Sequence, residues 1–417
     1  MIELLFALFL LSGLIKFFVF FLIGNILIID FTLLCAIALV GGYIFHFIRN
    51  SLDNKFYIVS ASRSIVFTLL VFYMWIILTL TYTRSPAYCY LKTFRFLTLV
   101  IALVFPLIYR NFKPGRFFHL FVYIGSILIF IYTALLPHFF AGYLRSYEYR
   151  EFVGKYLDIG YLSGIMILLL AFACPHIKRL PKVLLLAVNT SALMVSAARG
   201  AIIFLAFVLL IRFAVSFVTF MKRTWQFNFK NIFYITAAVG GFGGALYYVM
   251  DRYSIFIERT VKRLLLVFDP QSASVAKRFD QIYYSLDKIF DNAVNFLFGQ
   301  GIGSFGVLYD GVDGRQYPHN VILEISFELG IVGVILFITL LLLYFKKLRH
   351  NLNFVLIYIF LFLNSLKSYS LVDSRVMFGI LSVLLVYHTL LQRSENKKAA
   401  PNELATKDTK KHEERKR

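Results

Sequence analysis

Long runs of apolar residues dominate this sequence and restrict the folds open to it. Of its 417 residues, 60% are hydrophobic and only 16% are charged. A soluble globular protein has about 45–50% apolar and about 25% charged residues. Because about 20 apolar residues suffice to cross a bilayer as a helix, we expect an all-α, polytopic membrane protein. The unbroken runs argue against a disordered chain, a disulfide scaffold and a β-barrel porin.

Twelve apolar runs predict a bundle of about twelve transmembrane helices. These cover residues 3–23, 26–48, 64–82, 91–109, 117–136, 157–174, 180–197, 201–220, 231–250, 321–345, 353–372 and 376–391. The first run lacks a basic start and a small-residue cleavage site, so we interpret it as a retained span. The chain then divides into helices one to nine (1–250), a large loop (251–320), helices ten to twelve (321–391) and a polar tail (392–417).

The distribution of basic residues predicts which side of the membrane each connection faces. The chain has 43 Lys and Arg against 22 Asp and Glu, a formal net charge of +21. With the N-terminus in the cytoplasm, the five cytoplasmic connections each hold three basic residues and share one acid, Asp53. The large outer loop holds eight basic and eight acidic residues. This asymmetry follows the positive-inside rule, places both termini in the cytoplasm and requires no nucleic-acid partner.

The large loop at residues 251–320 has the patterns of an ordered segment. Apolar residues recur at helical spacing over 257–268 and again over 275–290. They predict two amphipathic helices that lie on the outer membrane surface or cap the bundle. The polar, aromatic-free tail after Ser394 is expected to be disordered.

Motifs for metals and cofactors are weak. Cys35, Cys89 and Cys174 have unrelated spacings and predict no disulfide or metal site. A G-x-G-x-x-G pattern covers residues 301–306, but its surroundings are not a βαβ unit, so a dinucleotide site is not expected. A structural glycine turn is favoured, and a turn whose N–H groups face an anion is the alternative.

Two arginines are candidate anion-binding residues on the outer side. Arg199 lies between two apolar runs, where charge is costly and often functional, although its side chain could also reach the headgroups. Arg278 lies in the second amphipathic segment, and its guanidinium matches phosphate geometry.

His319 is the candidate base. Asn320 can cap the apolar helix that starts near Val321, and a helix N-terminus favours the neutral imidazole. A neutral imidazole can accept a proton from a sugar hydroxyl, although an interfacial histidine without a role has the same position. Two cations and one base on the same side suit an anionic donor and a hydroxyl acceptor.

Four further charged residues lie near the outer membrane boundary. The sequence does not assign them a catalytic role. We expect them to form structural ion pairs, with one glutamate able to orient an arginine and with Asp373 paired to Arg375. They are Glu324, Glu328, Asp373 and Arg375.

The motifs around these residues resemble those of the O-antigen ligase and O-antigen polymerase superfamily. The matching pieces are Ser196-Ala-Ala-Arg199-Gly200, Lys277-Arg278-Phe279, Phe298-Gly-Gln-Gly-Ile-Gly-Ser-Phe305, and Pro318-His319-Asn320 followed by Leu323, Glu328, Leu329-Gly330 and Gly333. The motifs cover about residues 190–340, and the helix layout extends the resemblance to most of the chain.

The resemblance implies an inner-membrane glycosyltransferase of the GT-C type that acts on the periplasmic face without metal or cofactor. Its donor would be an undecaprenyl-diphosphate-linked glycan. The acceptor would be lipid A–core for a ligase, which we favour, or another lipid-linked glycan for a polymerase. Arg199 and Arg278 would bind the diphosphate, and His319 would activate the acceptor hydroxyl.

The sequence leaves two other classes of membrane protein open. A flippase or transporter would move the lipid-linked glycan without forming a bond, but the sequence has no clear internal repeat and its polar residues gather on one side. A non-catalytic membrane scaffold is the remaining alternative.

Overall fold

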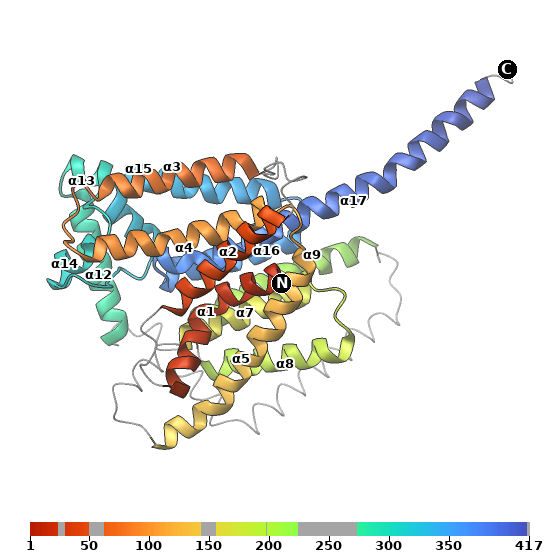
Figure 1. The fold of residues 1–417 in the computed structure, drawn as a ribbon. Coiled ribbons are helices and arrows are strands. Elements are labelled where there is room, and N and C mark those ends of the chain that lie inside the picture. The colour runs from red at the N-terminus through yellow and green to blue at the C-terminus, as the bar shows by residue number, and fades with distance from the viewer. Residues whose placement is uncertain (24–29, 50–61, 143–155, 197, 224–272, 415–417) are drawn as a thin grey trace.

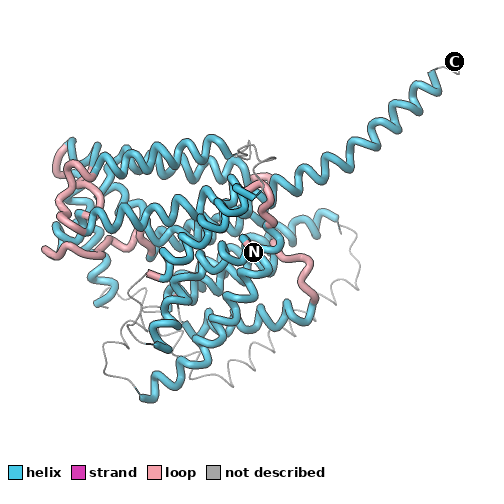
Figure 2. Tube along the Cα trace, in the orientation of Figure 1, coloured by secondary structure: helices cyan, strands magenta, loops and turns pink. Residues whose placement is uncertain are grey.

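The computed structural model describes residues 1–23, 30–49, 62–142, 156–196, 198–223 and 273–414, and all regular secondary structure among them is helical (Figures 1 and 2). The expected all-α class is therefore confirmed. The elements are α1 (Ile2–Ile23), α2 (Phe31–Arg49), α3 (Arg63–Thr79), α4 (Tyr88–Ile108), α5 (Pro114–Gly142), α7 (Tyr156–Phe172), α8 (Arg179–Ser196), α9 (Arg199–Arg223), α12 (Ala273–Phe290), α13 (Ala293–Phe298), α14 (Ser304–Asp310), α15 (Val321–Leu348), α16 (Leu352–Ser368), the 3-10 helix η3 (Leu371–Ser374) and α17 (Arg375–Glu414).

Five helices of the described segments are long and apolar enough to cross a membrane. They contain Tyr88–Ile108, Pro114–Ala134, Arg199–Met221, Val321–Leu348 and Leu371–Ser394, and shorter apolar helices accompany them. Every predicted span overlaps a described helix except 231–250, which lies outside the described residues, as does the first amphipathic segment at 257–268. The second amphipathic segment forms α12.

The outward surface of the bundle is apolar. Phe67 on α3 and Phe213 on α9 are 68% and 66% exposed, and many other large apolar side chains on these helices are exposed too. Soluble monomers rarely expose apolar patches of this extent. The surface is therefore suited to contact with lipid acyl chains.

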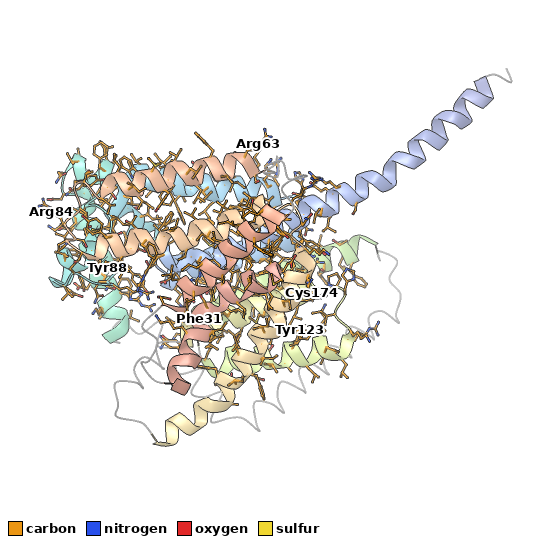
Figure 3. All side chains as sticks on the ribbon, viewed as in Figure 1. Phe31, Arg63, Arg84, Tyr88, Tyr123 and Cys174 are labelled. Atoms are coloured by element: carbon orange, nitrogen blue, oxygen red, sulfur yellow. The ribbon has the colours of Figure 1, made fainter. Side chains whose placement is uncertain are left out.

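Connections expected on the same side of the membrane meet at the same end of the bundle. At the end that carries α13 and α14, Thr83 Oγ1 donates to the carbonyl oxygen of Ile302 at 2.7 Å. At the other end, the Lys113 amide donates to Glu3 Oε1 at 3.2 Å. Figure 3 labels Arg84 at the first end and Arg63 at the second. Successive helices thus run up and down the bundle.

The last helix differs from the expectation of a disordered tail. Instead of a disordered tail after Ser394, α17 continues to Glu414 and projects away from the bundle (Figure 1). The tail is rich in Ala, Glu and Lys, which are strong helix formers. A helix that already begins inside the bundle also extends through such residues without a new nucleation step.

A break in α15 explains why the segment that packs against it is rich in glycine. Gly330 has φ 65° and ψ −170°, so the helix is interrupted there. The amide of Gln300 donates to the carbonyl of Phe327 at 2.8 Å, and the amide of Gly301 donates to the carbonyl of Glu328 at 2.9 Å. The glycine-rich segment therefore supplies donors to carbonyls at the break, as a structural turn would.

The glycine-rich segment also lies beside an anion, but this anion is a carboxylate of the same chain, that of Glu328. The Gly303 amide lies near the Glu328 carboxylate. A Cβ on Gly330 would lie 2.3 Å from the carbonyl oxygen of Leu297, so the two backbones approach more closely than any side chain allows. The glycine at position 330 is therefore needed to seat the turn on α15.

We predict that Gly330→Ala lowers the free energy of unfolding by about 3 kcal/mol or more, because it adds a clash to a backbone conformation nearly exclusive to glycine. Thermal or denaturant unfolding of the purified chain in detergent measures this. Gly13→Ala in α1 is the control, since no atom lies within 4 Å of its added Cβ. Equal stability of the two variants would contradict this account of the break.

Candidate functional site

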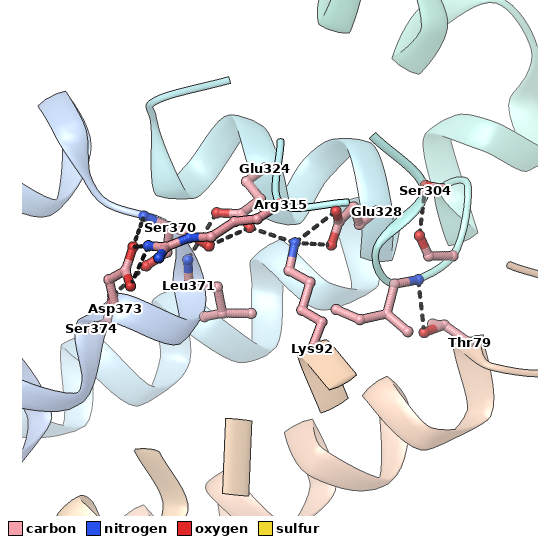
Figure 4. A network of polar contacts seen from close by, with 12 residues as sticks. Thr79, Lys92, Ser304, Arg315, Glu324, Glu328, Ser370, Leu371, Asp373 and Ser374 are labelled. Carbon is pink, nitrogen blue, oxygen red and sulfur yellow. Dashed lines mark hydrogen bonds and ion pairs between the residues drawn. The ribbon is translucent and has the colours of Figure 1, made fainter. Parts of the chain in front are cut away.

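A fully buried ion cluster fixes the start of α15 (Figure 4). Lys92 of α4 donates to Glu324 Oε1 at 2.5 Å and to the two carboxylate oxygens of Glu328 at 2.7 and 2.6 Å. All three side chains are 1% exposed. Our expectation of structural ion pairs is met for both glutamates, but their partner is a lysine on a distant helix rather than an arginine.

Further donors complete this cluster. The Ser370 hydroxyl donates to Glu324 Oε1 at 2.7 Å, and the Leu371 amide donates to Glu324 Oε2 at 2.8 Å. Buried charges are tolerated only when hydrogen bonds satisfy their remaining oxygens. The cluster therefore joins three elements, α4, α15 and the connection before η3, at the end of the bundle where the candidate residues lie.

Asp373 pairs with Arg315 rather than with Arg375. The Arg315 guanidinium donates to both Asp373 carboxylate oxygens at 2.8 and 2.7 Å. The Asp373 carboxylate raises the pKa of Arg315, so the guanidinium stays charged. Arg375 turns the other way, donates to the Ser12 hydroxyl at 3.0 Å and lies 5.0 Å from the Phe9 ring centre. Residues two apart in a helix do not face each other, which is why the expected pair is wrong.

His319 lies in the connection that leads into α15. Asn320 caps the helix as expected, its side-chain oxygen accepting from the amides of Ile322 and Leu323 at 3.0 and 3.1 Å. His319 has φ 54°, a left-handed conformation that is uncommon outside glycine. Its half-buried ring lies 4.6 Å from the ring of Tyr317. The backbone thus holds the imidazole in one place beside the positive end of α15.

Arg199 and Arg278 both lie near a third cation, Lys367. Arg199 begins α9, Arg278 lies in the second turn of α12, and Lys367 lies in the last turn of α16. The charges of both arginines act directly on Lys367. A Cβ on Gly200 would lie 3.2 Å from Lys367 Nζ, so the lysine lies against the start of α9. All three cations are half-buried. We call them the cation cluster.

The beginning of α7 connects His319 to the cation cluster. Tyr369, two residues after Lys367, lies with its hydroxyl 3.5 Å from Asp158 Oδ1. The charge of Asp158 also acts on Tyr317, the ring neighbour of His319. A Cβ on Gly160 would lie 2.2 Å from Ala198, so α7 packs directly against the residue before Arg199. These contacts link the three predicted residues indirectly, through α7, at one end of the bundle.

Sequence reasoning missed three charged residues of this region. Lys92, Arg315 and Lys367 each contact or neighbour a predicted residue. The cost of a charge inside an apolar run would have indicated Lys92 and Lys367, as it did Arg199. Arg315 lies in a polar connection and carries no such signal. Among the described residues, no group of three His, Cys, Asp or Glu side chains is placed to hold a metal ion.

A protein-family model matches part of the chain. The family model described as O-antigen ligase matches residues 183–338. This segment includes Arg199, Arg278 and His319 with the motifs around them. The match confirms the resemblance to the O-antigen ligase and polymerase superfamily. No curated protein sequence matches the chain.

We predict that Lys92→Met destabilises the chain by about 3–5 kcal/mol, because it leaves two buried carboxylates without their cation. The free energy of unfolding in detergent measures the change. Changing both Glu324 and Glu328 to Gln in the Lys92→Met background should restore much of the stability, since no buried charge then remains.

Lys346→Met is the matched control for this prediction. Lys346 is an exposed lysine in the last turn of α15, so its loss should change stability by less than about 0.5 kcal/mol. A similar effect of the two lysine substitutions would contradict the role given to the buried cluster.

Proposed function

With the O-antigen ligase domain at residues 183–338 as the premise, we propose that the chain is a glycosyltransferase of the bacterial inner membrane. It transfers a glycan from an undecaprenyl-diphosphate carrier to a sugar hydroxyl. The observation that carries this proposal is the convergence of Arg199 and Arg278 at the end of the bundle where His319 lies.

The cations suit the leaving group of this reaction. When the bond between the anomeric carbon and the phosphate oxygen breaks, the electron pair remains on the lipid diphosphate. Guanidinium groups form strong, often bidentate hydrogen bonds with phosphate oxygens. Arg199 and Arg278 would therefore bind the donor in the ground state and stabilise the charge that develops in the transition state.

His319 suits the acceptor side. Its neutral imidazole would take the proton of the acceptor hydroxyl while that oxygen attacks the anomeric carbon, opposite the departing diphosphate. The positive end of the α15 dipole would favour the neutral form, which is the form a base needs. Attack from the opposite face gives inversion at the anomeric carbon, and the step requires no metal or cofactor.

The proposed membrane arrangement is a GT-C-like bundle of about twelve spans. Its segments are the first nine helices (1–250), a periplasmic loop (251–320), the last three helices (321–391) and a cytoplasmic tail (392–417). The face of α12 supports a position at the outer membrane surface, since Phe279, Tyr283 and Phe290 are exposed while Gln281 and Ser285 are buried. An apolar face turned away from the protein suits the headgroup boundary. The active face is then periplasmic and both termini are cytoplasmic.

Among related reactions, we favour ligation to lipid A–core over polymerisation of lipid-linked repeats. Polymerases share the motifs on which this assignment rests, so the acceptor distinguishes the two. A flippase or transporter remains the rival class. It is supported less well, because the polar residues gather at one end of the bundle instead of forming a path through it.

We predict that His319→Ala, Arg199→Ala and Arg278→Ala each lower glycan transfer by roughly 100- to 10,000-fold, the usual range for loss of a base or an electrostatic contact. Transfer by purified protein from lipid-linked donor to acceptor measures this. Arg278→Lys should also be strongly impaired, because a lysine cannot form the bidentate contact.

Lys277→Ala is the control for these variants. Lys277 neighbours Arg278 on α12 but is exposed, and its loss should leave transfer nearly unchanged. Wild-type transfer by the Arg278→Ala variant, or equal loss in the Lys277→Ala variant, would remove Arg278 from the site.

The glycan profile of cells lacking the gene should separate the candidate reactions. A ligase leaves full-length glycan on its lipid carrier and none on lipid A–core. A polymerase leaves single repeats on the core. Purified protein that moves lipid-linked glycan across vesicles without forming a glycosidic bond would instead support the flippase. An unchanged profile in a His319→Ala strain would support a scaffold.

A further inference from the structure

Lys367 has surroundings unlike those of Lys92 and Arg315. It ends the apolar helix α16, a position where charge is costly. Lys92 has two glutamates and Arg315 has Asp373, whereas within the described segments no carboxylate forms an ion pair with Lys367. Its charged neighbours are Arg199 and Arg278. Because like charges repel one another, an anion bound among these three would make their grouping more favourable.

The start of α9 is shaped around this lysine. A Cβ on Gly200 would lie 2.7 Å from Lys367 Cδ and 3.2 Å from its Nζ, so the absence of a side chain there makes room for the lysine. Gly200 directly follows Arg199, the first residue of a 25-residue helix. The positive end of that helix dipole adds positive potential at the same point. The Lys367 side chain and the backbone at the start of α9 thus place positive charge at the same point.

From this geometry we propose that Lys367 is a third cationic ligand of the lipid diphosphate, beside Arg199 and Arg278. This inference rests on the proposed function. The two arginines supply directional hydrogen bonds, whereas the lysine adds a compact charge with freely placed donors. As the bond to the anomeric carbon breaks, the negative charge that stays on the diphosphate increases, and Lys367 stabilises it. Lys367 is therefore a substrate-binding residue that sequence motifs do not indicate.

The test uses the purified full-length chain in lipid nanodiscs and inorganic pyrophosphate as the probe. Pyrophosphate should raise the melting temperature of the wild-type chain, because it binds the folded state. Lys367→Met should weaken pyrophosphate binding about tenfold or more, the usual effect of losing a charge-assisted hydrogen bond. The variant without ligand should be as stable as the wild type or more stable, since a repulsive charge is gone. Lys367→Arg should retain most of the binding.

Transfer kinetics provide the second measurement. Lys367→Met should raise the donor KM, lower kcat, or both, whereas the acceptor KM stays near its wild-type value. Lys346→Met is the matched control, because this lysine also ends an apolar helix but lies at the opposite end of the bundle. It should leave pyrophosphate binding and the donor KM unchanged.

The outcomes separate this inference from the proposed function. If Arg199→Ala and Arg278→Ala abolish transfer while Lys367→Met binds pyrophosphate and donor as the wild type does, the lysine is not a ligand and the proposed function stands. If Lys367→Met loses stability without pyrophosphate and keeps its pyrophosphate affinity, its role is structural and the inference is overturned. If none of the three substitutions affects transfer, both this inference and the proposed function are wrong.

Discussion

The contact between Lys92 and the two glutamates of α15 determines much of the architecture at this end of the bundle. The lysine comes from α4, and the Ser370 hydroxyl and Leu371 amide that bind Glu324 come from the connection into η3. Because all three charges are buried, none of these elements can move away without leaving a charge uncompensated. The same helix start carries Asn320 and the His319 backbone, so the buried cluster also determines where the imidazole lies.

The charged residues of the region fall into two groups with different physical character. Lys92, Arg315 and their carboxylate partners are neutralised within the chain and hold elements together. In the cation cluster, positive charges from three helices lie close to one another. Such repulsion is unfavourable by itself, whereas a diphosphate bound among these charges would be attracted by all three. This contrast, more than any single residue, connects the fold to the proposed transfer reaction.

The sequence predicted the helices well because membrane spans are local features, and each apolar run contains its own signal. It also indicated Arg199, Arg278 and His319 through position and family resemblance. The pairing of charges was not predictable in the same way. Lys92 and Glu324 are 232 positions apart, and no local pattern connects them. Local proximity was misleading for Asp373 and Arg375, because adjacent helical positions face different neighbours. For the tail, composition predicted disorder, but helix propensity and continuity with α17 favoured a helix.

The central claim is that Arg199 and Arg278 bind the same diphosphate beside His319. An experimental structure of the chain with a lipid-linked diphosphate bound tests it most directly. The account predicts that the phosphate oxygens lie within hydrogen-bonding distance of both guanidinium groups, with the anomeric carbon turned toward the imidazole. A diphosphate bound elsewhere, or in contact with only one of the two arginines and far from His319, would contradict it.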